Sequence, residues 1–165
     1  MLSLYENSGY LSIPAVLGYG QKFNYIWGGR GTGKTYGGLK YCIEHKKIFV
    51  YMRSLQAQID TIKIPELSPF KKLNKDMGWS IYPKTIGKNV AGFYNTYTDD
   101  NGKLVYTGPI LGYAIALNTF ANVRGFDASD VTLWIYDEFI PEKTEKPVKN
   151  ACFAFLNAYE TMNRN

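Results

Sequence analysis

Hydrophobic residues along this chain change their spacing several times, and each change predicts a different kind of element. Residues 48–52 form a continuous apolar run, which is typical of a parallel strand buried on both faces. Ahead of this run, apolar side chains recur at helical spacing from residue 36 to residue 43. The aromatic segment 23–27 is β-prone and predicts an earlier strand, whereas residues 1–22 are expected to be irregular.

The rest of the chain predicts two short helices, a β-rich stretch and a final helix. The helices are expected at residues 55–63 and at 68–78, where Ser68 is the N-cap and Gly78 the terminator. Strands at 90–97 and 103–106 flank the turn Asp99-Asp100-Asn101-Gly102, which predicts a hairpin. We further expect an apolar segment at 110–117, a short helix or turn at 118–125, a strand at 132–136, and an amphipathic helix at 148–162 whose apolar face comprises Val148, Cys152, Phe155, Leu156, Tyr159 and Met162.

Composition narrows the class of protein without indicating a chemistry. The 165 residues are 45% hydrophobic and 20% charged, as in an ordinary globular domain, and the net charge of +5 is compatible with a polyanionic partner. Cys42 and Cys152 lie in predicted helices without C-x-x-C spacing, so we expect buried thiols rather than a disulfide or a zinc site. Because no signal peptide or membrane-length apolar run appears, a soluble, intracellular protein is expected.

One segment predicts a specific chemistry, because residues 28–35 match the phosphate-binding pattern G-x-x-x-x-G-K-[ST]. Its glycines allow successive backbone amides to surround an anion, and the helix N-terminus that follows favours negative charge. Lys34 is expected to reach the β- and γ-phosphates of ATP and the Thr35 hydroxyl to bind Mg²⁺. The simpler alternative is a glycine-rich turn with an incidental lysine. The predicted nucleotide-binding residues in this loop are Gly28, Gly29, Arg30, Gly31, Thr32, Gly33, Lys34 and Thr35.

A second acidic motif follows the predicted strand at 132–136. Asp137 is suited to hold the Mg²⁺ of the nucleotide, and Glu138 to act as the general base that polarises the attacking water. An exposed acidic pair that merely closes a strand is the alternative. In combination with the loop, however, the pair predicts an ATPase of the P-loop NTPase (ASCE) type. Its expected fold is an α/β three-layer αβα domain with a mainly parallel central sheet and an antiparallel β insertion.

With both motifs in place, the chain resembles the ATPase domain of a viral DNA-packaging motor. More narrowly, it is similar to the encapsidation ATPases of small podovirus-type tailed bacteriophages, which are related to terminase large subunits. The resemblance rests on residues 28–35 and 134–139, on the strand that ends in Arg53, and on residues 160–164. It implies that residues 1–165 form one ATPase domain and lack the C-terminal nuclease-like domain of the family.

The resemblance also implies partners. We expect a ring-shaped homo-oligomer, a pentamer, docked on the procapsid portal in the host cytoplasm and driving double-stranded DNA through its pore. A structural RNA is a partner in some members of the family. The candidate DNA contacts are the lysines Lys71, Lys72 and Lys75 and the tip of the 90–106 hairpin.

In ring ATPases an arginine of the neighbouring subunit completes the charge around the γ-phosphate. The two candidates are Arg124 and Arg164, and the resemblance favours Arg164 with Arg124 assisting; both could equally be solvated surface residues. Arg53 ends a predicted core strand, where it could face the site or cap the next turn. Two alternative functions stay open at this point: another ASCE motor, such as a helicase or phage-assembly ATPase, and a nucleotide-dependent binding module.

Overall fold

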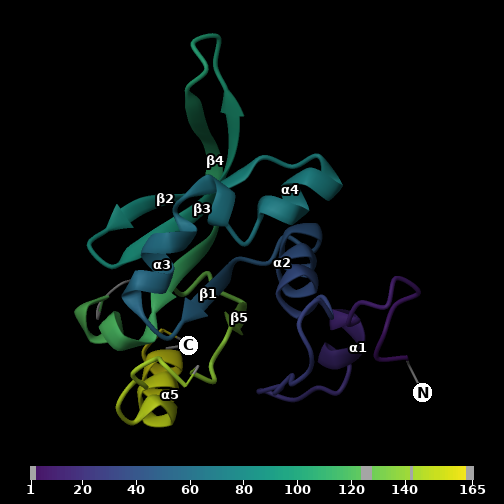
Figure 1. Cartoon of the computed structure of the whole chain (residues 1–165), viewed down its shortest axis with the longest axis vertical. Helices are drawn as coiled ribbons and strands as arrows, with labels where there is room; N and C mark the ends of the chain where they lie inside the picture. The colour runs from purple at the N-terminus through teal and green to yellow at the C-terminus, as the bar shows by residue number, and fades with distance from the viewer. Residues whose placement is uncertain (1–2, 124–127, 142, 163–165) are drawn as a thin grey trace.

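The computed structural model describes residues 3–123, 128–141 and 143–162, and these residues form a mixed α/β fold (Figure 1). The sheet has five strands in the order β2-β3-β4-β1-β5. Their bounds are β1 Phe49–Arg53, β2 Ile81–Gly87, β3 Val90–Thr98, β4 Leu104–Ala116 and β5 Leu133–Tyr136.

The strand directions differ from the expected arrangement. β1 lies between β4 and β5 and is parallel to both, whereas β3 is antiparallel to both β2 and β4. The hairpin strands therefore belong to the central sheet itself, and the sheet is mixed rather than mainly parallel with a separate insertion. Because β4 is long, its first half completes the hairpin and its second half re-enters the core beside β1.

Helices cover both faces of the sheet. The helices are α1 Ile13–Leu17, α2 Lys34–Glu44, α3 Gln56–Ile62, α4 Lys71–Met77 and α5 Ala151–Met162, with 3-10 turns η1 Pro65–Leu67 and η2 Leu117–Val123. Apolar residues of α2, α3 and α4 pack on the face that carries Phe49 and Tyr51. Residues of η2 and α5 pack on the opposite face with Val50 and Met52. The expected three-layer arrangement is thus present.

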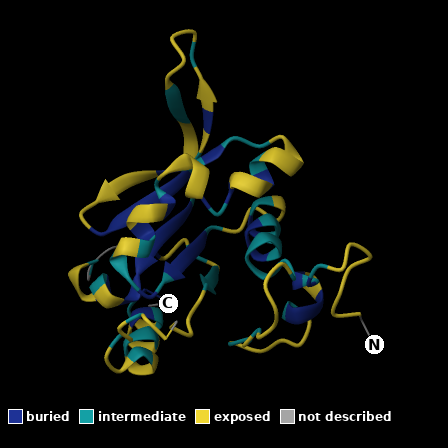
Figure 2. Ribbon diagram, viewed as in Figure 1, coloured by how far each residue is buried: buried dark blue, intermediate teal, exposed yellow. Residues whose placement is uncertain are grey.

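The buried centre of the sheet is β1, shown dark blue in Figure 2. Its first four residues are buried, as the uninterrupted apolar run predicted. The ring of Phe49 stacks on Phe93 with centroids 5.7 Å apart. On the neighbouring strand, a Cβ at Gly112 would lie 2.6 Å from the Phe49 ring, so only glycine fits there.

The predicted hairpin is confirmed. Asp99 Oδ1 accepts hydrogen bonds from the backbone amides of Asn101 at 3.0 Å and Lys103 at 2.8 Å, and Gly102 adopts φ +76°. Beyond Asn95 the β3–β4 ribbon continues without β2 and projects from the body at the top of Figure 1. We call residues 96–107 of this ribbon the arm.

Four expectations about local structure are wrong in whole or in part. Ser68 is not the N-cap of the helix expected at 68–78, because the N-cap of α4 is Phe70, whose amide donates to Ser68 Oγ at 3.2 Å. Segment 23–27 is not a strand, and its Tyr25 and Trp27 are 79% and 89% exposed. The 1–22 region is not wholly irregular, because Ser12 caps the short helix α1 by accepting a bond from Ala15 N. The apolar face predicted for residues 148–162 is right in part: Val148, Phe155 and Met162 pack in the core, as does Ala158, whereas Cys152 and Leu156 are exposed.

Candidate functional site

The glycine-rich loop ends where α2 begins, at Lys34. Gly31 and Gly33 have left-handed φ values of +80° and +79°, and Gly33 is the N-cap of the helix. The Lys34 ammonium folds back over the loop and donates to Gly28 O at 2.9 Å and Gly29 O at 2.7 Å. The backbone conformation therefore places a positive charge inside the turn, ahead of a helix N-terminus.

This geometry fits an anionic ligand. A Cβ at Gly29 or Gly31 would meet no atom within 4 Å, so the mouth of the loop is open. Thr32 Oγ1 closes the turn by donating to Gly29 O at 3.1 Å, and Thr35 follows Lys34 in the first turn of α2. Arg30, the third residue of the motif, is exposed. Backbone amides, an ammonium and a helix N-terminus together favour phosphate.

The N-terminal segment covers part of this loop, which the sequence did not predict. Leu11 N donates to Thr32 O at 3.0 Å. The Tyr10 side chain is so close to Gly33 that a Cβ there would lie 2.7 Å from Tyr10 Cγ. The Tyr10 ring also meets Tyr36 edge to face, with centroids 5.3 Å apart.

The acidic pair lies at the carboxyl end of β5, where the next strand β1 also ends. Asp137 N donates to Met52 O at 2.9 Å, which extends the pairing of the two strands by one residue. Tyr51 donates its hydroxyl hydrogen to Asp137 Oδ2 at 2.9 Å. Arg53 Nη1 approaches the same oxygen at 3.4 Å, and Arg53 Nη2 forms an ion pair with Glu138 Oε2. One arginine thus holds both carboxylates.

The surroundings of this cluster shift two pKa values. Burial raises the pKa of Tyr51, and the negative charge of Asp137 raises it further, so the phenol is a hydrogen-bond donor at neutral pH. Burial acts to lower the pKa of Arg53, but Tyr51, Glu138 and Asp137 together raise it. Arg53 Nε is buried with no hydrogen-bond partner among the described residues.

Glu138 is held in an unusual backbone conformation. Its φ is +50°, a left-handed value that non-glycine residues seldom adopt, while its side chain is 62% exposed. Such a conformation costs of order 1 kcal/mol and tends to occur at functional sites. The Arg53 role was left open by the sequence, and the structure assigns this side chain to the acidic pair rather than to a turn.

The two motifs lie on neighbouring elements, since a Cβ at Gly38 of α2 would be 3.2 Å from Ile135 Cδ1 of β5. The hydrogen bonds of Lys34 stay within its own loop, however, and those of Asp137 and Glu138 described above are made with Tyr51, Met52 and Arg53. The described residues contain no cluster of three or more His, Cys, Asp or Glu side chains suited to a metal. Arg124 and Arg164 lie outside the described residues.

In the part of the chain that the structure describes, no helix has the length and apolar character needed to cross a bilayer. No protein-family model matches the chain. Two curated relatives match the chain. They are the DNA packaging proteins of Bacillus phages PZA and phi29, each 25% identical over 97% of this chain and 44% of their own length. The chain therefore spans less than half of these relatives.

Two solved structures have a similar fold. The first is the crystal structure of the N-terminal domain of the DNA packaging ATPase from bacteriophage phi29, with a TM-score of 0.66, 24% identity, and coverage of 99% of this chain and 74% of that one. The second is the phi29 viral genome packaging motor assembly, with a TM-score of 0.65, 24% identity, and coverage of 99% and 44%. The chain is thus similar, over nearly its whole described length, to the phi29-type DNA packaging proteins, and the resemblance predicted from its motifs is confirmed.

Proposed function

We propose that this chain is the ATP-hydrolysing domain of a phage DNA-packaging motor, with a P-loop fold of the ASCE type. The observation that carries the proposal is the Lys34 ammonium, held 2.7 and 2.9 Å from two loop carbonyls at the N-terminus of α2. A β- or γ-phosphate oxygen is a stronger partner for this ammonium than a neutral carbonyl, so ATP would draw it outward.

The segment ahead of the loop supports the P-loop assignment. In the described residues, β5 pairs with β1 along one edge and leaves the other edge open. Segment 23–27 is connected to this part of the molecule by ring contacts, from Phe23 to Phe155 at 6.0 Å and from Tyr25 to Phe139 at 6.3 Å. We infer that segment 23–27 pairs with the open edge of β5 when nucleotide fills the loop, as the strand predicted there.

The residues present also suit Mg²⁺. Bound between nucleotide and protein, the ion would neutralise phosphate charge during transfer. Thr35 and Asp137 would hold it, and Asp137 is equipped for this because both of its hydrogen bonds from described residues use Oδ2 and leave Oδ1 free. Glu138 would accept the proton of the attacking water. For that, Arg53 must first release the Glu138 carboxylate.

The partners follow from the relatives and belong to the same proposal. Relatives of this chain are DNA packaging proteins, and a similar structure is part of a packaging motor assembly. We propose double-stranded DNA as the substrate that is moved, a procapsid portal as the docking partner, and a pentameric ring with Arg164 and Arg124 as candidate trans-acting arginines. A structural RNA belongs to the same set of proposed partners.

The Lys34→Ala variant tests the nucleotide site. It should lose nearly all affinity for a fluorescent ATP analogue, because no other residue of the loop supplies an ammonium at this place. Lys40→Ala is the matched control: Lys40 lies in the same helix, and its 3.7 Å pair with Glu44 is a surface contact. Affinity of Lys34→Ala within threefold of wild type would refute the P-loop assignment.

The contact of Arg53 with both Asp137 and Glu138 favours a second candidate function. Since Arg53 binds the expected general base, a chain that never releases it would bind nucleotide and turn over poorly, as a nucleotide-dependent binding module. The ATPase rate measured against protein concentration, with and without duplex DNA, separates the two. A rate that rises with concentration and with DNA supports the motor, and a flat, negligible rate supports the module.

A further inference from the structure

The Tyr10 side chain connects the glycine-rich loop to α4. Its ring lies against Gly33, where an added Cβ would come within 2.7 Å, and the next residue, Leu11, donates its amide hydrogen to Thr32 O at 3.0 Å. The N-terminal segment is therefore fixed on the loop by a side-chain contact and a backbone hydrogen bond. Any movement of the Tyr10 ring changes the space beside Gly33.

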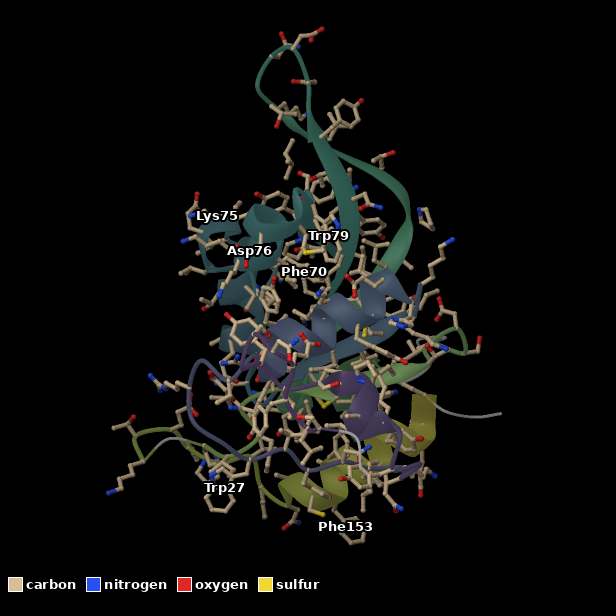
Figure 3. The ribbon with its side chains drawn as sticks, turned by 90° about the vertical axis from the view of Figure 1, so that its right-hand side faces the viewer. Trp27, Phe70, Lys75, Asp76, Trp79 and Phe153 are labelled. Carbon is tan, nitrogen blue, oxygen red and sulfur yellow. The ribbon has the colours of Figure 1, made fainter. Side chains whose placement is uncertain are left out.

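Lys72 of α4 contacts the same ring. Its ammonium lies 5.0 Å from the centroid of the Tyr10 ring and 5.4 Å from that of Tyr36, and it donates a hydrogen bond to the Tyr10 hydroxyl. Burial raises the pKa of Tyr36, and the carboxylate of Asp76, which Figure 3 labels beside Lys75, raises it further. The Lys72 side chain of α4 thus contacts two aromatic rings next to the loop.

The outer face of α4 also carries positive charge that suits a polyanion. Lys71, Lys72 and Lys75 are all exposed along its short length. The tip of the arm, the other place where DNA contact was expected, carries Asp99 and Asp100 against the single lysine Lys103. Two carboxylates at the tip would repel phosphates, so the arm is the poorer candidate.

Building on the nucleotide-binding function proposed above, we propose that the lysine face of α4 contacts the phosphate backbone of duplex DNA and that Lys72 transmits this contact to the glycine-rich loop through Tyr10. A phosphate attracts the Lys72 ammonium more strongly than a phenol and two rings do. Once the ammonium turns to the phosphate, the Tyr10 ring loses its hydrogen bond and its cation–π contact. The ring is then free to leave Gly33, and the part of the loop that it covers becomes accessible to nucleotide.

This coupling has a defined sign. DNA on α4 raises the affinity of the loop for nucleotide, and by linkage nucleotide raises the affinity for DNA by the same factor. Lys72→Gln removes the hold on Tyr10 and mimics the DNA-bound state of the loop. Lys75→Gln removes an equal charge from the same helix, but Lys75 has no contact with Tyr10 or Tyr36 among the described residues, so it is the matched control.

The experiment measures binding of a fluorescent ATP analogue to the full chain with and without a saturating short duplex of mixed sequence. In the wild type and in Lys75→Gln, the duplex should tighten analogue binding by about fivefold or more. Lys72→Gln should bind the analogue without DNA as tightly as the wild type does with DNA, and the duplex should add nothing. If Lys72→Gln and Lys75→Gln behave alike, the coupling through Tyr10 is refuted.

A second measurement decides the DNA contact without nucleotide. The slope of log affinity for the duplex against log salt concentration should decrease in magnitude by about 0.9 in each variant, because each loses one phosphate contact. An unchanged slope in both variants, or no binding of duplex by the wild type, would refute the α4 surface. Wild-type protein that fails to bind the analogue would refute the nucleotide function, whereas analogue binding that DNA leaves unaltered refutes the coupling alone.

Discussion

Replacing Arg53 by glutamine should destabilise the chain by an amount that the structure allows us to work out. The Arg53 and Asp137 side chains are 15% and 18% exposed, so their pair is largely removed from water. Removing one partner of a fully buried pair costs about 3–5 kcal/mol. Here the cost is smaller, because Tyr51 still donates to Asp137 and glutamine keeps a hydrogen-bond donor.

The second contact of Arg53 adds little. Glu138 is 62% exposed, and ion pairs to such a group contribute less than about 1 kcal/mol. We therefore expect Arg53→Gln to lower the free energy of unfolding by about 2–3 kcal/mol. For a chain of this size that corresponds to a fall in Tm of roughly 5–10 °C.

Urea unfolding followed by tryptophan fluorescence measures this change, with the m-value as a check that the unfolded state is unaltered. Lys63→Gln is the control, because the Lys63–Asp60 pair is also an ion pair, at 2.8 Å, but Asp60 is 56% exposed. That variant should lose less than about 0.5 kcal/mol. If the free energy of unfolding of Arg53→Gln is also within about 0.5 kcal/mol of the wild-type value, the contacts of Arg53 contribute no net stability and the burial argument is wrong.

Three other variants test separate parts of the structure. Glu138→Gln should bind nucleotide normally but lose turnover in a phosphate-release assay, since a carboxamide cannot accept the proton; normal turnover would assign the base elsewhere. Gly33→Ala should lower the free energy of unfolding by about 1–3 kcal/mol and remove most of the nucleotide affinity, because φ is +79° and the added Cβ would meet Tyr10. Gly9→Ala is the control: Gly9 has the same φ but open space around it, so this variant should keep the nucleotide affinity. Burial raises the pKa of Cys42 from 9.0 to about 12, because the buried site disfavours the thiolate. The stability that comes from keeping this thiol protonated is therefore fully present below pH 9 and is lost as the pH rises towards 12. The free energy of unfolding should fall there by about 1.4 kcal/mol per pH unit, and Cys42→Ala should remove this part of the slope; an identical slope in both proteins would contradict the assignment.

The elements that the sequence predicted well are those whose burial or turn chemistry is local. Burial on both faces requires an uninterrupted apolar run, and residues 48–52 differ by one position from the strand β1. The hairpin was predictable because Asp99 and Gly102 satisfy the turn with their own side chain and backbone. The Lys34 start of α2 follows from the loop glycines in the same way.

The structural predictions fail where the conformation of a segment depends on the distant part of the chain against which it packs. Aromatic residues at 23–27 favour a strand, but in this structure Phe23 packs on Phe155 and Tyr159 instead of pairing in the sheet. On α5 the predicted face correctly included Met162, but it also included Cys152 and Leu156, which are exposed, and omitted the buried Ala158. Ring contacts from Trp134 and Tyr136 to Phe155 orient the helix, and no local pattern encodes them.

The acidic site could be predicted only in part, since Arg53 is 84 positions from Asp137 in the sequence. Its geometry nevertheless argues for function over simple stability. A purely structural arginine would be expected to satisfy its buried donors, yet Arg53 Nε has no partner among the described residues, and Glu138 keeps a strained φ of +50° beside it. Both costs fall on the two residues that must separate in the proposed function, in which Glu138 is the base. A cluster held together at a local cost needs less free energy to open, and ligand charge at the neighbouring loop is a natural source of that energy.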